Sequence, residues 1–385
     1  MDTLWEYKKI GDVCTVERGG SPRPIDKFIT EDENGINWIK IGDTTESMYI
    51  TKTEQKIIPE GIKKSRYVRP GDFLLSNSMS FGRPYILQID GCIHDGWLVL
   101  RDDSDFFDKR FLYYCLSSKT TYEKFKSMAV GGVVNNLNSE MVRNVLVPVP
   151  DRVEQCEIAD LLDKLTQIIS YRKNEIRLLD TLIKARFIEL FEDGQSPIRT
   201  VEELCSEIVD CPHTTPKYEG ELKNPAIRTS EIKKGYITWD SMRYVSDEEY
   251  EERVARLRPK AGDIVYGREG TFGNAAVLPE GYNFCLGQRV MLLRPDYSRC
   301  TSEYLLHAVI SDDVYRQALE KNNASTVAHV NVKDVKQFRI PLPSFEKQNL
   351  FADFVKQINK SKVVVQKALD EAQTLFDSLM QEYFG

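Results

Sequence analysis

With 385 residues, the chain has room for two domains of ordinary size, and a hydrophobic content of 41% lets each bury a core. A formal net charge of −7 excludes a uniformly basic nucleic-acid binder but leaves a locally basic groove open, because phosphate binding depends on the local field. No apolar run approaches the roughly 20 residues that cross a bilayer, and the start lacks a signal-peptide core, so we expect a cytoplasmic protein that contacts no membrane.

Two kinds of segment alternate along the chain. We expect a globule at 1–152, a long helix at 153–194, a second globule at 195–345 and a second long helix at 346–385. Short apolar runs between turn signals predict strands in the globules, and a longer periodic stretch predicts one helix in each. The runs lie at 37–41, 72–75, 97–100 and 290–293, and the helical stretches at 109–126 and 302–321. The expected fold class is therefore mixed α/β.

The two long helices carry apolar residues three and four positions apart. Each runs for about 40 residues, hence roughly 60 Å. Such a stripe needs a partner, and the other long helix is the obvious one. We expect a two-helix antiparallel coiled coil that separates the globules, with Lys173, Arg177, Lys184 and Arg186 on its solvent side.

An internal repeat is the most informative feature of the chain. Pro148 and Gln155 recur 193 residues later, as Pro341 and Gln348. Nearer the start the offset is 191, as the recurrence of the PGD turn at 70–72 as AGD at 261–263 shows. A unit of about 190 residues is too long for a solenoid. It predicts two copies of one domain-plus-helix module related by a pseudo-two-fold axis.

The loops after the glycine turns are the least alike between the copies. Residues 76–83 read SNSMSFGR, whereas residues 267–274 read GREGTFGN. A similar framework with different loop chemistry is what two readers of different sequences would show. Asn138 and Asn331 occupy one equivalent position, for which we favour a turn requirement of the fold over base contact.

These features together resemble the specificity (S) subunit of type I DNA restriction–modification systems. The resemblance covers essentially the whole chain and rests on the order of the motifs, each occurring twice. They are the PGD and AGD turns, the loops ending in Phe-Gly, the VPVP and IPLP strands before a glutamine-containing helix start, and the loops at 19–22 and 210–216.

The resemblance implies a division of labour with partner subunits. Each globule would be a target recognition domain that reads one half of a bipartite, asymmetric site in double-stranded DNA. The helices would set the spacing and dock two adenine methyltransferase subunits, and two ATP-driven restriction subunits join in the full assembly. The chain itself would be non-enzymatic and bind no cofactor, so S-adenosylmethionine, ATP and magnesium would belong to the partners.

Candidate DNA-contacting residues follow from base chemistry: arginine reads guanine, asparagine or glutamine reads adenine, and hydroxyls bind phosphate. In the first globule they are Arg18, Ser21, Arg23, Lys63, Lys64, Arg66, Asn77, Ser78, Ser80 and Arg83. In the second they are His213, Thr214, Thr215, Lys217, Arg268, Glu269, Thr271, Asn274, Gln288 and Arg289. A solvated charged face is the alternative for Lys63, Lys64 and Arg66, and a solvated turn residue is the alternative for Arg83 and Arg268. Capping of local turns is an equal alternative for Asn77 and Ser78.

The sequence contains only weak indications of catalysis or of metal binding. No Pro-Pro dipeptide occurs, which removes the motif of amino-methyltransferases, and no Gly-Lys dipeptide occurs, which removes a Walker A loop. Nuclease-like triplets at Asp43 and Asp210 fall at non-equivalent repeat positions. The eight cysteines show no CxxC, and His213 with Cys205 and Cys211 fits no zinc spacing. The remaining alternative of another class is a coiled-coil scaffold that binds proteins.

Overall fold

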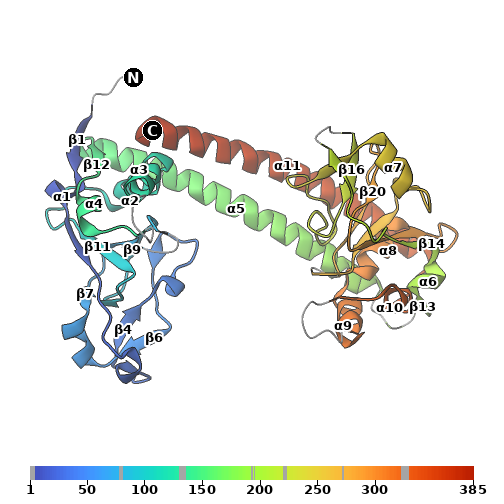
Figure 1. The fold of residues 1–385 in the computed structure, drawn as a ribbon, viewed down its shortest axis with the longest axis horizontal. Coiled ribbons are helices and arrows are strands. Elements are labelled where there is room, and N and C mark those ends of the chain that lie inside the picture. Colours follow the sequence, from blue (N-terminus) through green and yellow to red (C-terminus); the bar gives the residue numbers. More distant parts are fainter. Residues whose placement is uncertain are drawn as a thin grey trace. The chain divides into compact units, whose positions relative to one another are not determined.

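The computed structural model describes residues 5–77, 81–129, 136–191, 194, 196–219, 223–270, 273–321 and 329–385. The chain forms two compact units (Figure 1). The first comprises Met1–Lys173 with Lys367–Gly385, and the second comprises Asn174–Gln366. Among the described residues, no helix combines the length and apolar character that a membrane span requires.

The first unit is built on two five-stranded sheets packed face to face. One sheet has the order β2-β11-β8-β9-β5 and the other the order β3-β6-β4-β10-β7. The first comprises β2 (Thr15–Arg18), β11 (Trp97–Arg101), β8 (Phe73–Ser76), β9 (Pro84–Leu87) and β5 (Tyr49–Ile50). The second comprises β3 (Ile29–Thr30), β6 (Gln55–Ile57), β4 (Ile36–Ile39), β10 (Gly91–Ile93) and β7 (Arg66–Val68).

The central strands of the first sheet are apolar on both faces because both faces are covered. In β8, Phe73 and Leu75 pack into the core under the helices, whereas Leu74 packs into the core shared with the second sheet. Trp97 and Val99 of β11 lie in that second core too. The continuous apolar runs at 72–75 and 97–100 are therefore strands, as expected.

Helices and a short ribbon complete the first unit. The ribbon pairs β1 (Glu6–Lys9) with β12 (Leu146–Val149). The short helices are α1 (Ile10–Val13), η1 (Ile25–Lys27), η2 (Ile41–Asp43), η3 (Pro59–Lys64), α2 (Lys109–Ser117), α3 (Lys119–Ala129) and α4 (Ser139–Arg143). The first half of α5 (Arg152–Phe191) and the last turns of α11 (Phe345–Phe384) also belong to this unit.

The second unit repeats this architecture. Its sheets have the orders β14-β21-β18-β19 and β15-β17-β16-β20. The strands are β14 (Cys205–Asp210), β21 (Val290–Pro295), β18 (Ile264–Gly267), β19 (Ala275–Val277), β15 (Tyr218–Glu219), β17 (Arg243–Val245), β16 (Asn224–Ile227) and β20 (Cys285–Leu286). A ribbon again pairs β13 (Ile198–Thr200) with β22 (Arg339–Pro341). The short helices are α6 (Val201–Leu204), α7 (Asp247–Arg253), α8 (Ser302–Val309), α9 (Asp312–Lys321) and α10 (Val332–Lys336).

One expectation about the helices was wrong. The stretch at 109–126 was expected to be one helix, but it is divided into α2 and α3. Ser118 between them has extended backbone angles, and its hydroxyl accepts a hydrogen bond from the Thr121 amide at 3.1 Å. In the second copy Ser311 separates α8 from α9 and accepts from the Val314 amide at 3.3 Å. A serine cap starts a new helix at the same place in both copies.

A buried glutamine ties each long helix to its globule. Gln155 is 1% exposed, and its Oε1 accepts from the Asp108 amide at 2.7 Å. Gln348 is fully buried and accepts from the Thr301 amide at 2.9 Å. In both copies the glutamine Nε2 donates to the backbone oxygen five residues earlier, at 3.0 Å. Buried backbone groups need such partners, which explains why this residue recurs in the sequence.

The glycine turn is built alike in both copies. The glycine has a φ of +92° in the first copy and +90° in the second, a conformation that side chains disfavour. The next residue is an aspartate paired with an arginine of the neighbouring strand. Arg101 Nε donates to Asp72 at 3.2 Å, and Arg294 Nε donates to Asp263 at 2.9 Å. The internal repeat is therefore confirmed down to individual hydrogen bonds.

The two long helices pair antiparallel within each unit. In the first unit, the beginning of α5 packs with the end of α11, through Ile158, Leu162, Phe376, Leu379 and Phe384. In the second, the end of α5 packs with the beginning of α11, through Ile183, Phe187, Phe191, Phe351 and Val355. An ion pair of 2.5 Å joins Lys362 to Asp180 in the same unit. The mixed α/β class and the two-helix antiparallel layout are confirmed.

The cysteines take no part in disulfides: all eight are free, and six of them are buried. Burial raises the pKa of the Cys14 thiol, and that of Cys285, to about 12. Such thiols stay protonated and behave as small core hydrophobes, as expected.

Candidate nucleic-acid interface

In the first unit, loops from distant parts of the chain meet at the turn between β10 and β11. Asn77, which follows β8, is 2% exposed and its Nδ2 donates to the Asp95 carbonyl at 2.8 Å. The Asn77 amide donates to the Gly96 carbonyl at 3.0 Å, and the Asn77 carbonyl accepts from the Leu137 amide at 3.0 Å. We call residues 18–23, 77, 83, 94–96 and 137 the first loop cluster.

The loop after β2 closes the first loop cluster over Asp95. Ser21 Oγ donates to Asp95 Oδ1 at 2.7 Å, and Arg18 Nε donates to the Asp95 carbonyl at 3.3 Å. Arg23 lies 3.5 Å from the same carboxylate with 83% of its side chain exposed. The hydrogen bond from Ser21 lowers the pKa of Asp95. The cluster thus carries a fixed negative charge with two exposed arginines around it.

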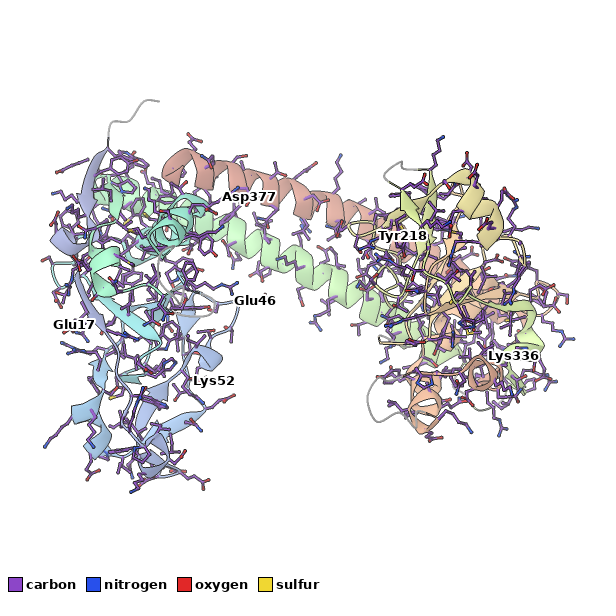
Figure 2. All side chains as sticks on the ribbon, viewed as in Figure 1. Glu17, Glu46, Lys52, Tyr218, Lys336 and Asp377 are labelled. Atoms are coloured by element: carbon purple, nitrogen blue, oxygen red, sulfur yellow. The ribbon has the colours of Figure 1, made fainter. Side chains whose placement is uncertain are left out.

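Exposed basic residues of η3 and β7 border this cluster. The Lys64 carbonyl lies 3.2 Å from the position that a Cβ on Gly20 would take, so the segment contacts the loop after β2. Lys63 and Arg66 are exposed, and Arg66 forms a 3.1 Å ion pair with Glu17, which Figure 2 labels. These residues place positive charge beside the loop cluster, which is the charge that a phosphate contact requires.

A second loop cluster occupies the equivalent place in the second unit. Arg268 stands where Asn77 stands: its amide donates to the Arg289 carbonyl at 2.9 Å, and its carbonyl accepts from the Val330 amide at 2.9 Å. We call residues 210–217, 268–269, 288–289 and 329–330 the second loop cluster.

The structure places Arg268 inside the domain, although the glycine-flanked loop suggested an exposed residue. It is 8% exposed, and its guanidinium donates to Asp210 Oδ1 at 2.7 Å and to the Val330 carbonyl at 3.4 Å. Its Nε is buried and has no hydrogen-bond partner among the residues that the structure describes. The physical reason for the burial is Asp210 at the end of β14, which balances the charge.

The loop after β14 carries the exposed candidates of this cluster. His213, Thr214, Thr215 and Lys217 are all exposed. Gln288 Nε2 donates to Thr215 Oγ1 at 2.8 Å. Arg253 of α7 donates to the Thr214 carbonyl at 3.3 Å, and His213 Nε2 lies 3.7 Å from Asp210. Hydrogen bonds from Gln288 and Arg253 therefore fix the loop on the domain, while its own side chains stay exposed to solvent.

The remaining candidates divide into paired and inward-facing residues. Glu269 and Arg289 form a 3.0 Å ion pair, and Arg289 is exposed with a φ of +66°. Asn274 Nδ2 donates to the Ile232 carbonyl at 3.2 Å, which directs this side chain back to its own domain. Ser78, Ser80 and Thr271 lie outside the described residues.

The nuclease-like carboxylates have structural partners. Asp43 accepts from the Lys40 amide at 2.7 Å and from the Glu54 amide at 3.0 Å, so it caps η2. Asp210 pairs with Arg268. Among the described residues, no group of three or more histidine, cysteine, aspartate or glutamate side chains could hold a metal ion.

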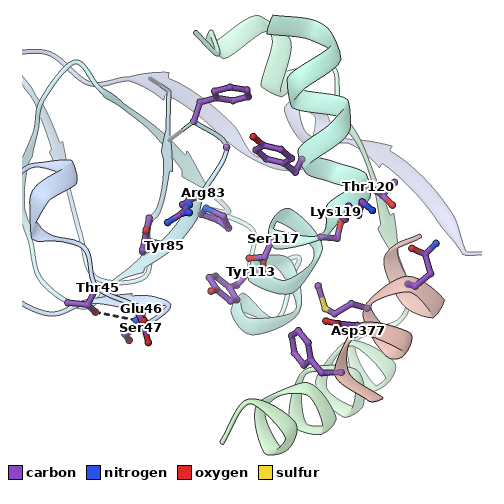
Figure 3. Close-up of a pocket in the computed structure, with 18 residues that line it drawn as sticks. Thr45, Glu46, Ser47, Arg83, Tyr85, Tyr113, Ser117, Lys119, Thr120 and Asp377 are labelled. Atoms are coloured by element: carbon purple, nitrogen blue, oxygen red, sulfur yellow. Dashed lines mark hydrogen bonds between the residues drawn. The ribbon is translucent and has the colours of Figure 1, made fainter. Parts of the chain in front are cut away.

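A cleft of about 910 Å³ opens within the first unit and shares Arg83 with the first loop cluster (Figure 3). It lies between the loop at 45–47, the β8–β9 loop with Arg83, the α2–α3 junction and the end of α11. Lys119 and Asp377 line it. The residues at an offset of 193 in the second copy are Asp312 and Lys184, which form a 2.5 Å ion pair. The two copies therefore carry swapped charges here.

Sequence reasoning considered Asp210 only as part of a loop and of a nuclease-like triplet, and it missed the central role of Asp95 and Asp210 in the clusters. Asp95 and Asp210 organise the neighbouring arginines, but each lies far along the chain from them: Arg18 is 77 residues from Asp95, and Arg268 is 58 residues from Asp210. The repeat offers no signal for them, because the two aspartates fall at non-equivalent positions: the residue 193 positions after Asp95 is Gln288. It does not reveal which loop each aspartate holds.

Comparison with known proteins gives a consistent result. The family model "Type I restriction modification DNA specificity domain" matches residues 3–178 and 214–372. Over 385 aligned residues the chain is 22% identical to the type I restriction enzyme EcoBI specificity subunit of Escherichia coli, covering 91% of this chain and 78% of the relative. The MjaVIII specificity subunit of Methanocaldococcus jannaschii is 21% identical over 403 residues, covering 98% and 91%.

Two solved structures share the fold. A chain described under "Structural basis underlying complex assembly and conformational transition of the type I R-M system" has a TM-score of 0.61 at 17% identity, with 99% of this chain and 97% of that one covered. The type I restriction-modification S subunit from M. genitalium has a TM-score of 0.57 at 14% identity, with 100% and 97% covered. Because the family model matches most of the sequence, in two places, the chain belongs to the type I restriction–modification DNA specificity family, whose members are non-catalytic recognition subunits.

Proposed function

We propose that each globular domain, residues 1–152 and 195–345, reads one half of a bipartite, asymmetric site in double-stranded DNA. One observation carries this proposal: the two domains share a frame, by which we mean their sheets, glycine turns and buried glutamines, but their loop clusters differ. Asn77 and Arg268 make the same two backbone hydrogen bonds, but a buried amide bonded to Asp95 organises one cluster and a buried guanidinium bonded to Asp210 organises the other. One frame with two chemistries suits a site whose halves differ.

The long helices, residues 153–194 and 346–385, set the gap between the half-sites in this proposal. An α-helix of 40 residues is stiff and extends roughly 60 Å, enough to span about one turn or more of B-DNA. An insertion near Gly194 would leave the helix pair unchanged, because the last turns of α5, with Phe187 and Phe191, belong to the core of the second unit. Paired insertions near Lys173 and Gln366 lengthen both helices and test the idea directly.

Two adenine methyltransferase subunits would dock on the helices. Within the first unit, α5 exposes Leu161, Ile168 and Tyr171 at 38%, 43% and 63%. Their spacing of seven and three residues places them on one helical face, and a row of exposed apolar side chains is typical of a protein–protein contact. Two ATP-driven restriction subunits complete the assembly in this proposal.

The partner subunits would supply the chemistry. S-adenosylmethionine, ATP and magnesium would bind to them, and this chain would hold the flanks of the site while the methyltransferase extrudes the adenine. A rigid protein is needed to keep the DNA in place during this step. Buried side chains such as Gln155 and Gln348 give that rigidity, because they fix the domains to the helices.

Methylome sequencing tests the proposal. A strain that carries the gene with a neighbouring adenine methyltransferase should show a methylated motif split into two unlike halves, and deletion of the gene should abolish it. A methylome that deletion leaves unchanged would contradict DNA selection and favour a protein-binding scaffold.

A further inference from the structure

Two arginines lie over one tyrosine ring beside the second loop cluster. The Arg243 guanidinium carbon lies 4.9 Å from the centroid of the Tyr218 ring, and that of Arg228 lies 5.8 Å from it. Figure 2 labels Tyr218 on this unit. Guanidinium groups at this distance are attracted to the negative face of an aromatic ring. We call Tyr218, Arg228 and Arg243 the Arg–Tyr patch.

The sheet fixes the geometry of the Arg–Tyr patch. Tyr218 of β15 pairs with Val245 of β17, so Arg243, two residues before Val245, lies diagonally from Tyr218 on the same face. Arg228 follows β16, and Glu231 holds it: Arg228 Nε donates to Glu231 Oε2 at 3.1 Å. Glu231 is fully buried. One arginine is therefore anchored and neutralised, whereas the other rests only on the ring.

Arg243 is the free cation of the Arg–Tyr patch. It is exposed, and no described residue forms an ion pair or a side-chain hydrogen bond with its guanidinium. The acidic groups nearest along the chain are Asp240, which is exposed, and Asp247, which accepts from Asn224 Nδ2 at 2.8 Å, and Glu219 on the neighbouring strand is exposed too. A guanidinium that is oriented by a ring and forms no ion pair within the protein is able to bind an anion of another molecule.

The Arg–Tyr patch is continuous with the second loop cluster. Lys217, an exposed member of the cluster, directly precedes Tyr218. Gly287 directly precedes Gln288 of the cluster, and a Cβ on Gly287 would lie 2.6 Å from Arg228 Cγ. A duplex seated on the loop cluster would therefore extend its backbone toward Arg243.

The equivalent positions of the first unit carry neither the arginine nor the tyrosine. By strand register, Arg243 opposite Ala226 corresponds to Gln55 opposite Trp38, and Tyr218 corresponds to Ile29. A glutamine and an isoleucine replace the charge and the ring. The Arg–Tyr patch is thus a property of the second domain and not of the shared frame.

We propose that the Arg–Tyr patch is a DNA phosphate site that extends the interface of the second domain, with Arg243 as the phosphate ligand and Tyr218 as its support. This inference rests on the proposed function. A phosphate contact carries no sequence information by itself, so Arg243 adds affinity and register while the second loop cluster reads bases.

Fluorescence anisotropy with a labelled duplex of mixed sequence tests the assignment on the full-length chain. Arg243→Gln should weaken binding roughly fivefold at fixed salt and reduce the slope of log affinity against log salt by about 1. Arg243→Lys keeps the charge and should keep the slope. Tyr218→Leu should weaken binding less than Arg243→Gln does, because it removes only the support.

Two controls separate the possible results. Arg199→Gln removes the same charge from exposed β13, and Gln55→Ala alters the equivalent position of the first domain. Both should bind as the unaltered chain does. Equal binding by Arg243→Gln and the unaltered chain, an equal loss in Arg199→Gln, or a lost slope in Arg243→Lys would overturn the assignment while leaving the proposed function intact. Failure of the unaltered chain to bind any duplex would overturn both.

Discussion

The two loop clusters differ in side chains but not in the backbone that presents them. In the first, Asn77 bonds the Asp95 carbonyl, and in the second, Arg268 bonds the Asp210 carboxylate. Both residues are nearly buried, and both join the same strand ends through the same two backbone bonds. The comparison of the two copies shows that the shared backbone positions the loops. The few side chains that differ between the clusters determine which groups each loop can bind.

The largest expected loss of stability follows from substitution of the buried glutamines that both copies share. Gln155→Ala and Gln348→Ala each leave buried backbone groups without partners, so each should lower the free energy of unfolding by about 3 kcal/mol. Chemical denaturation measures both. Gln167→Ala, on the exposed surface of α5, is the matched control and should change little. If the two substitutions lowered the free energy of unfolding by different amounts, the two glutamines would not have equivalent structural roles.

A second effect should be confined to the second domain. Arg268→Ala removes the buried arginine that pairs with Asp210 and empties the centre of the second loop cluster, so it should cost about 2 kcal/mol of stability in that unit. Methylome sequencing should show relaxed recognition of one half-site only. In the double variant with Asp210→Asn, part of the stability should return. Equal relaxation of both half-sites would contradict the assignment of one cluster to each half.

A pH effect should also separate the copies. Burial lowers the pKa of His307, which packs between Phe187 and Phe351, to about 4 from 6.5. Asp180 and Lys362 face it with opposite charges. The unfolded chain takes up this proton at higher pH than the folded chain, so stability is present above about pH 6.5 and is lost as the pH falls toward 4.

The first copy has Tyr114 at the position of His307, and its hydroxyl donates to Asp163 at 2.6 Å. Hydrogen exchange should therefore show the second unit losing about 1–2 kcal/mol between pH 7 and pH 5 through this residue. His307→Tyr should reduce that loss, and His213→Gln, at an exposed histidine, should not. The same acid loss in His307→Tyr and in the unaltered chain would contradict the role of His307.

The smallest effect concerns the equivalent asparagines. Asn138 caps α4, because its Oδ1 accepts from the Met141 amide at 2.9 Å. Asn331 precedes α10 but makes no such bond, and its Nδ2 donates to Asp334 at 3.2 Å. Asn138→Ala should cost about 1 kcal/mol and Asn331→Ala less, as thermal unfolding would measure. Equal costs would show that the cap is not the reason for the shared residue.

Much of the frame could be predicted because the chain contains it twice. The recurrence of Gln155 as Gln348 and of the glycine turns identified the positions that the fold needs, and the structure shows the bonds they make. Asn138 and Asn331 both lie at helix starts, as the preference for a turn requirement suggested. The helix break at Ser118 was missed because apolar periodicity continues through it.

The loops were harder to predict because their partners lie far along the chain. Nothing local marks Arg268 as buried, since Asp210 is 58 residues away. Arg243 and Tyr218 were missed for another reason: the repeat offset shifts between the copies in this stretch, so the replacement of Gln55 and Ile29 could not be seen without strand register.

Exchange of one globular domain tests the central claim most directly. Residues 195–345 would be replaced by the equivalent domain of another specificity subunit, and the methylome of cells with the cognate methyltransferase would be sequenced. The account predicts a split motif in which one half is new, the other half is unchanged and the gap is kept. A motif in which both halves change, or in which neither does, would contradict separate reading by the two domains.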